Sequence, residues 1–324
     1  MACVLPRLPV TAAARYDPWD TSARPAPASF IMRHPDFPSS LAMPVGWHAS
    51  LRLRFAERAG RTAMVERRHE GPLRVQKPLY PEGAICHGVV LHPPAGVAGG
   101  DLLDIDIAVE AGAHAVLATP GATKWYKSQG RDAAQQVRIE VAEGAQLDWL
   151  PQENIVFDDA RARLATDVVV APGGSAIGWD AVVLGRLASG EHWARGSLWL
   201  DTRIAGPDRA LWIEQSHLDA ASPLRGALAG MDGLPIMATL WAVGQGATQE
   251  LAESLAERLP YRPDLRAGVT CLAGRGQPAS QSMLLVRVLG RDMEAVRHVM
   301  IDCWNTLRMP IHGVPARPLR LWAT

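Results

Sequence analysis

Apolar and polar residues alternate along much of the chain between residues 46 and 218. In the first run, Leu51, Leu53 and Phe55 are separated by two arginines. A period of two places apolar side chains on one face of a β-strand and charged side chains on the other. Glycine and proline interrupt the runs at short intervals, which predicts many short strands. The clearest runs are residues 51–55, 103–107 and 137–141.

A short motif recurs within this region. Residues 109–113 read Val-Glu-Ala-Gly-Ala, and similar turns follow at 141–145 and 170–174. A spacing of about thirty residues between glycines predicts stacked β units in a solenoid-like or sandwich arrangement. The alternative is a chance recurrence of glycine turns in an antiparallel protein.

The C-terminal third changes to helical spacing. Apolar residues recurring every four positions predict an amphipathic helix near 248–259 that ends before Pro260. A second apolar stripe predicts a helix near 292–307, with Asp292 as N-cap and Pro310 as the stop. The predicted fold class is therefore mainly β, a stacked, β-helix-like or sandwich body of many short strands with two α-helices in the C-terminal third.

The first segment, residues 1–44, differs from the rest of the chain because it holds eight of the 25 prolines and many alanines. We expect a disordered tail there and a single β-rich domain over residues 45–324. A translation start at Met43 would leave that domain complete.

Composition narrows the function classes. Lys and Arg together number 33, as do Asp and Glu, and this balance argues against a general nucleic-acid binder. No apolar run reaches the roughly 18–20 residues of a membrane span, and the start has no secretory apolar core. The four cysteines are scattered among 324 residues, unlike a disulfide scaffold. We expect a cytoplasmic protein without membrane or nucleic-acid partners.

Common enzyme motifs are missing from the sequence. It contains no phosphate-binding Gly-x-x-x-x-Gly-Lys loop, no Gly-x-Ser-x-Gly elbow, no His-Glu-x-x-His and no Cys-x-x-Cys. Thiol and imidazole groups do gather at Cys86, His87 and His92, and such side chains bind transition metals. One alternative function is thus a metal-dependent enzyme on a β-scaffold, although a buried cysteine and a hydrogen-bonded core histidine explain most such groups.

Two further segments interrupt the apolar pattern. Residues 124–127 place two lysines beside Trp125, as in a carbohydrate or single-stranded nucleic-acid platform, although a protein contact suits the neutral chain better. Gln152, Glu153 and Asn154 break a stretch that otherwise reads as buried. Buried polar groups destabilise the fold unless they are hydrogen-bonded or hydrated. These residues therefore either line a water-filled passage or belong to an ordinary exposed turn.

Four long segments of the sequence are residues 71–83, 86–101, 119–128 and 147–160. In this order and spacing they resemble the UreD (UreH) family of urease accessory proteins. A Leu-Gly-Arg and Gly-Glu pattern over 184–191 continues the resemblance, and the chain end, 317–324, matches imperfectly.

The resemblance implies a β-rich helical stack with two helices and a non-catalytic scaffold or chaperone for urease maturation. It implies binding to UreF, through it to the GTPase UreG, and to apo-urease. Nickel(II) would be transient cargo, with no tightly bound cofactor.

The resemblance also directs attention to carboxylates within its segments. A conduit must let its ion leave, which favours several weak oxygen ligands. We therefore expect Glu153, Asp158 and Glu191 to line a nickel passage, with Asp101 a weaker candidate. Cys86, His87 and His92 are lesser candidates for a transient metal site. Three tryptophans lie in apolar stripes and are expected in the core: Trp149, Trp179 and Trp304.

Overall fold

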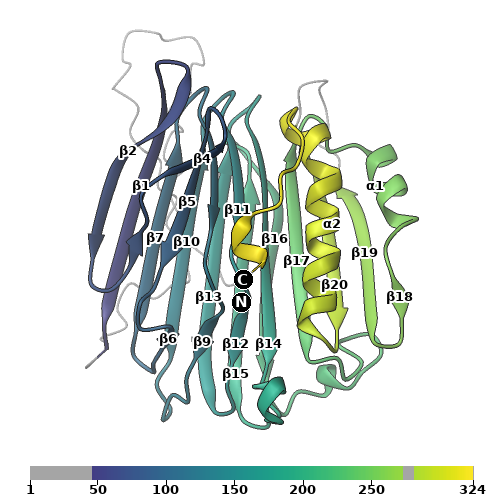
Figure 1. Ribbon diagram of the computed structural model, residues 1–324. Helices are drawn as coiled ribbons and strands as arrows, with labels where there is room; N and C mark the ends of the chain where they lie inside the picture. The colour runs from purple at the N-terminus through teal and green to yellow at the C-terminus, as the bar shows by residue number, and fades with distance from the viewer. Residues whose placement is uncertain (1–45, 273–280, 324) are drawn as a thin grey trace, which may run out of the picture. The chain divides into compact units, whose positions relative to one another are not determined.

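Two β-sheets face each other in the computed structural model, which describes residues 46–272 and 281–323 (Figure 1). The chain separates into Met1–Ala42 and Met43–Thr324, and every described residue belongs to the second unit. The tail expected at 1–44 lies outside the described residues.

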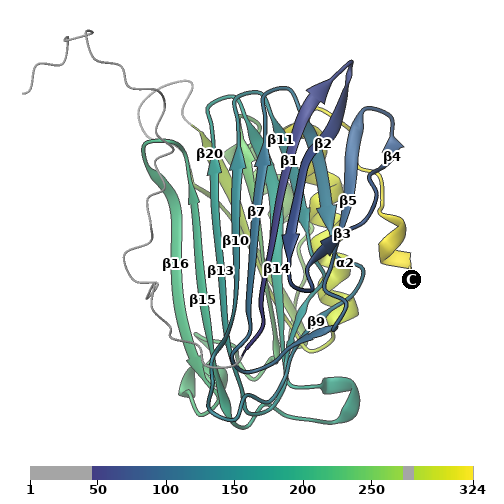
Figure 2. The same ribbon diagram turned by 90° about the vertical axis from the view of Figure 1, so that its left-hand side faces the viewer.

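The smaller sheet has seven strands and the larger has thirteen. In Figure 2, β16, β15, β13, β10 and β7 of the smaller sheet lie side by side in this order. The seven strands are, in spatial order, β16 (Ala210–Asp219), β15 (Gly196–Ala205), β13 (Ala160–Val170), β10 (Ala133–Val141), β7 (Leu102–Val109), β1 (His48–Arg58) and β2 (Arg61–Glu70). The thirteen-stranded sheet runs β18 (Tyr261–Arg262), β19 (Leu265–Leu272), β20 (Ser282–Gly290), β17 (Ile236–Gly244), β14 (Ser175–Leu184), β11 (Gln146–Leu150), β8 (His114–Ala118), β5 (Ile85–Leu91) and β3 (Arg74–Val75), with β4 (Leu79–Glu82), β6 (Gly96–Val97), β9 (Thr123–Trp125) and β12 (Asn154–Val156) beside this path.

The chain coils between the two sheets. Strands β7, β10, β13 and β15 are parallel neighbours in one sheet, and β5, β8, β11 and β14 are parallel neighbours in the other. Because consecutive long strands alternate between the sheets, each circuit stacks on the last as in a β-solenoid. This confirms the predicted stacked, mainly β fold class.

The recurring glycine motif forms the turns of this coil. Gly112, Gly144 and Gly173 all have positive φ, at 75°, 66° and 74°, a conformation that glycine adopts without steric cost. Each turn hydrogen-bonds to the next, for example through the amide of Ala142 and the carbonyl of Val109, 2.9 Å apart. The repeat read from the sequence is therefore one structural turn, stacked three times.

Two α-helices occupy the C-terminal third, as predicted. Helix α1 spans Gln249–Ala256 and α2 spans Met293–His312. In the described part of the chain, three short 3₁₀ helices cover Leu187–Ser189, Pro223–Arg225 and Arg320–Ala323. No helix among the described residues has the length and apolar character needed to cross a membrane.

Helix α2 was predicted to begin after Asp292 and to stop at Pro310. Asp292 caps its start by accepting a hydrogen bond from the Ala295 amide at 2.9 Å, which confirms the predicted N-cap. The predicted stop at Pro310 is wrong, because α2 continues to His312. Proline in the last turn disturbs little of the helix behind it, and Gly313 in the left-handed region ends α2 instead.

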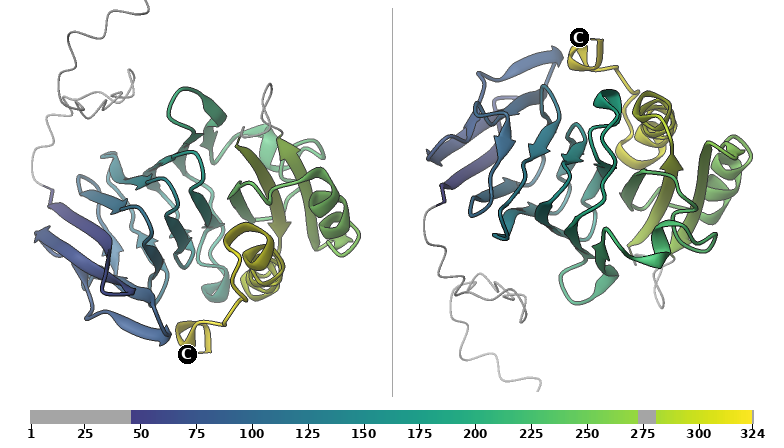
Figure 3. Two further views of the ribbon diagram at one scale, coloured as in Figure 1. Left: turned by 90° about the horizontal axis from the view of Figure 1, so that it is seen from above. Right: turned by 90° about the horizontal axis from the view of Figure 1, so that it is seen from below.

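The core has two layers, one between the sheets and one between the larger sheet and the helices. In Figure 3, α2 lies against the outer side of the strands near β17 and β20. Trp149 belongs to the inter-sheet layer, whereas Trp179 and Trp304 belong to the layer under the helices. All three are buried, which confirms their assignment to the core.

Close packing between β14 and β17 gives a stability prediction. A Cβ at Gly178 would lie 2.2 Å from Cζ2 of Trp241, whose side chain is fully buried. We expect Gly178→Ala to lower the free energy of unfolding by about 1–3 kcal/mol through overpacking. Chemical denaturation measures this effect. The control is Gly268→Ala on β19, where no atom lies within 4 Å of the added Cβ. Equal effects of the two changes would contradict the close packing of Trp241 against Gly178.

Candidate functional site

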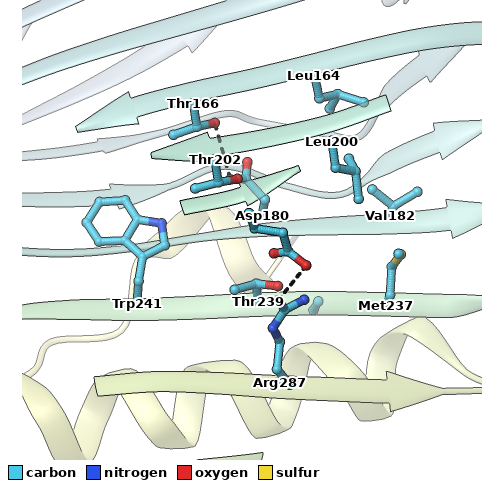
Figure 4. Close-up of a pocket in the computed structure, with 12 residues that line it drawn as sticks. Leu164, Thr166, Asp180, Val182, Leu200, Thr202, Met237, Thr239, Trp241 and Arg287 are labelled. Atoms are coloured by element: carbon cyan, nitrogen blue, oxygen red, sulfur yellow. Dashed lines mark hydrogen bonds and ion pairs between the residues drawn. The ribbon is translucent and has the colours of Figure 1, made fainter. Parts of the chain in front are cut away.

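A cavity lies between the two sheets where β13, β15 and β16 face β14, β17 and β20. It offers about 40 Å³ to the centres of water molecules, more than the roughly 10–15 Å³ that one water requires. Figure 4 shows Thr166, Thr202, Asp180, Thr239 and Arg287 turned into this space. An inter-sheet space in a β-sandwich is normally filled by apolar side chains, so this polar lining is unusual.

Strand register explains how these side chains meet. In the seven-stranded sheet, Thr166 of β13 pairs with Thr202 of β15, which pairs with Glu214 of β16. In the facing sheet, one row joins β14, β17 and β20 in the same way. We call the two facing rows the polar rung; its six members are Thr166, Thr202, Glu214, Asp180, Thr239 and Arg287.

Contacts between the sheets join the two rows. The hydroxyl of Thr166 donates to Oδ2 of Asp180 at 3.3 Å. An ion pair joins Nη2 of Arg287 to Oε1 of Glu214 at 2.5 Å. Glu214 therefore has a cationic partner, whereas Asp180 has no ion pair within residues 46–272 and 281–323.

The Asp180 carboxyl is the most perturbed acid of the rung. Desolvation by the surrounding protein raises its pKa to about 7, and the Thr166 hydrogen bond opposes this only weakly. The side chain keeps partial solvent exposure because it borders the cavity. A carboxyl with this pKa exchanges a proton readily near neutral pH, and its anion has no protein cation to satisfy it.

The sequence interpretation missed Asp180 and Glu214. A signal was present at Asp180, which interrupts the otherwise apolar run Ile177–Leu184. Glu214 gave no such signal, because it begins the polar half of β16, where Gln215 and Ser216 follow it. Its position follows only from pairing across β15 and β16.

Among the carboxylates expected to line a passage, Asp158 and Glu191 lie together. Oδ1 of Asp158 accepts hydrogen bonds from the amides of Ala194 and Arg195 at 2.8 and 2.7 Å. Oε1 of Glu191 accepts the Asp158 amide at 3.0 Å, and its Oε2 pairs with Arg186 at 2.6 Å. Bonding to Arg195 lowers the pKa of Asp158, and bonding to Arg186 lowers that of Glu191. Both are ionised but already engaged.

Glu153 and Asp101 occupy other positions with other partners. Glu153 pairs with Arg297 of α2 at 2.6 Å and borders a small groove beside Trp179. Asp101 accepts the amides of Trp47 and Ala98 at 2.8 and 2.9 Å, which closes a turn. In the described part of the chain, no metal-ligand group includes any of the four predicted carboxylates.

The thiol and imidazole candidates do not converge. Cys86 is buried in the inter-sheet layer, and burial raises its pKa. His87, the next residue of β5, points to the opposite face, where its Nε2 lies 2.8 Å from Oε1 of Glu82. His92 lies beyond the strand end, and burial lowers its pKa. Within the described ranges these three residues form no common metal-ligand group.

In the stacking platform proposed at residues 124–127, Trp125 is not available to a ligand. Trp125 is 1% exposed, and its Nε1 donates to Oδ1 of Asn154 at 3.0 Å. A buried indole offers no face on which a base or sugar could stack. Lys127 pairs with Asp159 at 3.3 Å. The platform interpretation is therefore wrong at Trp125, whereas the neighbouring Tyr126 is 37% exposed.

Comparison with known proteins agrees with the resemblance. The sequence model of the UreD urease accessory protein family matches residues 48–323. A urease accessory protein UreD from Cupriavidus metallidurans is 84% identical over 293 residues, which is 90% of this chain and 100% of the relative. Proteins of the same name from Ralstonia nicotianae and Bordetella pertussis are 58% and 45% identical, over 90% and 86% of this chain and 100% and 98% of their own lengths. A β-solenoid whose sequence matches in this way along its described length belongs to the UreD family of urease accessory proteins.

Proposed function

We propose that this chain acts in urease maturation as a non-catalytic scaffold. It bridges apo-urease to UreF and, through UreF, to UreG, and it provides a route for nickel(II) into the urease active site. Family membership supports the role in maturation. The missing phosphate-binding loop supports assigning GTP hydrolysis to UreG.

The nickel route passes the polar rung. One observation carries this proposal: Asp180 presents a carboxyl without a cationic partner to a cavity large enough for water. Threonine hydroxyls and a single carboxylate are weak oxygen ligands, which attract a hydrated dication and still release it. Nickel is cargo here, so a tight cage of nitrogen and sulfur ligands would defeat the purpose.

Asp158 and Glu191 form a second proposed contact for the ion, at loops that precede β13 and β15. A passing dication would have to compete there with Arg195 and Arg186. The proposal predicts that Asp158→Ala combined with Glu191→Ala lowers the nickel content of co-expressed urease, as measured by mass spectrometry of the purified enzyme. Full nickel loading with an intact accessory complex would remove this pair from the route. Glu153 belongs to the same proposal, with Asp101 as its weaker member.

The scaffold role is tested by co-purification from cells that express the urease components. We expect this chain to copurify with UreF, UreG and apo-urease, and we expect urease made without it to lack nickel. We also expect poor solubility of the chain alone and rescue by UreF, because an apolar interface would otherwise be exposed. Normal nickel loading in the absence of this chain would contradict the proposal. Catalytic turnover by the isolated chain with a bound metal would favour the enzyme alternative.

A further inference from the structure

A second cluster of metal-ligand side chains lies away from the polar rung, under the end of α2. His114 begins β8, Asp148 lies in β11 and His312 ends α2, and one ligand atom from each lies within 4.8 Å of the others. Nε2 of His114 is 3.0 Å from Oδ2 of Asp148, and Nε2 of His312 is 3.5 Å from its Oδ1. The Asp148 and His312 side chains are 0% exposed and that of His114 is 9% exposed.

The fixed charges around this cluster are one guanidinium and two carboxylates. Nη1 of Arg308 lies 2.6 Å from Oε2 of Glu82, and its Nε lies 3.4 Å from Oδ2 of Asp148. Two carboxylates thus share one guanidinium in a region that excludes water. With both carboxylates ionised, this buried cluster needs one more positive charge. Either a proton on His87, His114 or His312 or a bound cation supplies it.

The orientation of His312 favours a metal ion. Nδ1 of His312 lies 2.7 Å from Oγ of Ser175, which fixes the ring and directs Nε2 toward Asp148. That Nε2 is buried and has no hydrogen-bond partner within the described residues. Metal-binding histidines are typically held in this way, with the second nitrogen bonded to an oxygen. Trp304 Nε1 also donates to Oδ1 of Asp148 at 2.7 Å, which fixes the carboxylate.

We propose that His114, Asp148 and His312 bind one divalent late first-row transition metal, with zinc as the representative ion. Two imidazoles and a carboxylate suit this class of ion, and water completes four-coordination. A dication changes the net charge from minus one to plus one, and a metal-bound hydroxide, which forms near neutral pH, brings it to zero. The ion links β8 and β11 to α2, so its role is to fasten the helix to the sheet. This site retains its ion, in contrast to the weak oxygen ligands of the nickel route.

The test uses the full-length chain, made with a cleavable solubility tag and stripped with a chelator. Zinc titration against a chromophoric competitor is expected to give one tight equivalent and to raise the melting temperature. His114→Gln or His312→Gln should abolish that equivalent. Ser175→Ala removes only the bond that orients His312, and it should weaken zinc affinity by about 10–100-fold.

Two controls separate this site from others. Asp180→Asn in the polar rung and His217→Gln on the surface should leave zinc affinity unchanged. Should either ligand variant fail to fold, X-ray absorption of zinc-loaded wild-type protein must show two imidazole ligands. The absence of a tight equivalent, its persistence in both ligand variants, or fewer than two imidazoles would overturn the proposal. None of these results depends on the nickel route.

Discussion

Replacing Arg308 by methionine is expected to remove at least about 3 kcal/mol from the free energy of unfolding. The Arg308 side chain is 0% exposed and lies between Glu82 and Asp148. Methionine fills a similar volume but leaves both carboxylates in the interior without their guanidinium. A buried ion pair that loses one partner is strongly destabilised, because the remaining charge keeps its desolvation penalty.

A second arginine of α2 provides the matched control. Arg297 pairs with Glu153 at 2.6 Å, but its side chain is 31% exposed. Arg297→Met should therefore change the free energy of unfolding by no more than about 1 kcal/mol. Denaturant unfolding of the two variants gives the comparison. If both changes have the same small effect, the buried charge network does not hold α2 in place.

The Arg308 effect should depend on pH. Desolvation is the largest single effect on the pKa of Glu82 and raises it. The hydrogen bonds from His87 and Arg308 together outweigh desolvation, so the pKa lies below its usual value. A carboxyl whose pKa is lower in the folded protein than in the unfolded chain stabilises the fold at pH values above its pKa in the unfolded chain. This stabilisation is lost as the pH falls through its pKa in the folded protein. The difference between wild type and Arg308→Met should thus shrink in acid.

Replacing Asp180 by asparagine is expected to stabilise the protein while it impairs nickel transfer. The pKa of Asp180 is about 7 in the folded protein and about 3.9 in an unfolded chain. The contribution of Asp180 to the free energy of unfolding of the wild-type protein therefore falls as the pH rises from about 4 to about 7. Asparagine does not ionise, so the stability advantage of Asp180→Asn should widen over that interval and level off above it. Unfolding at several pH values measures this, and a destabilised variant at pH 8 would contradict the assigned environment.

The sequence predicted the solenoid because its signals are local. Alternation at residues 51–55 and glycine turns such as Gly112 report burial and backbone conformation within a few neighbours. The stop at Pro310 was wrong for a similar reason, since a proline in the last turn leaves the preceding bonds of α2 in place. A rule that ends a helix at proline does not compare the small cost of a proline in the last turn with the packing energy of the whole helix.

The polar rung could not be predicted, because its members meet only through strand register. Thr166, Thr202 and Glu214 belong to three separate strands, and nothing in their local sequence indicates the shared row. Asp148 was overlooked in the same way: it stands between Leu147 and Trp149 in a segment that the family resemblance had already marked. Its neighbours His114 and His312 are distant in sequence.

In the proposed route, nickel passes Asp180 on its way to urease. The direct test is the nickel content of urease purified from cells that co-express all accessory proteins with wild type, Asp180→Asn or Asp167→Asn. Asp167 is a control on β13 that pairs with Arg203 at 2.8 Å and takes no part in the rung. We predict that Asp180→Asn lowers the nickel content at least about tenfold, equivalent to ~1.4 kcal/mol of lost cation stabilisation, with the accessory complex intact. Full nickel loading with Asp180→Asn, equal to that with Asp167→Asn, would contradict the claim.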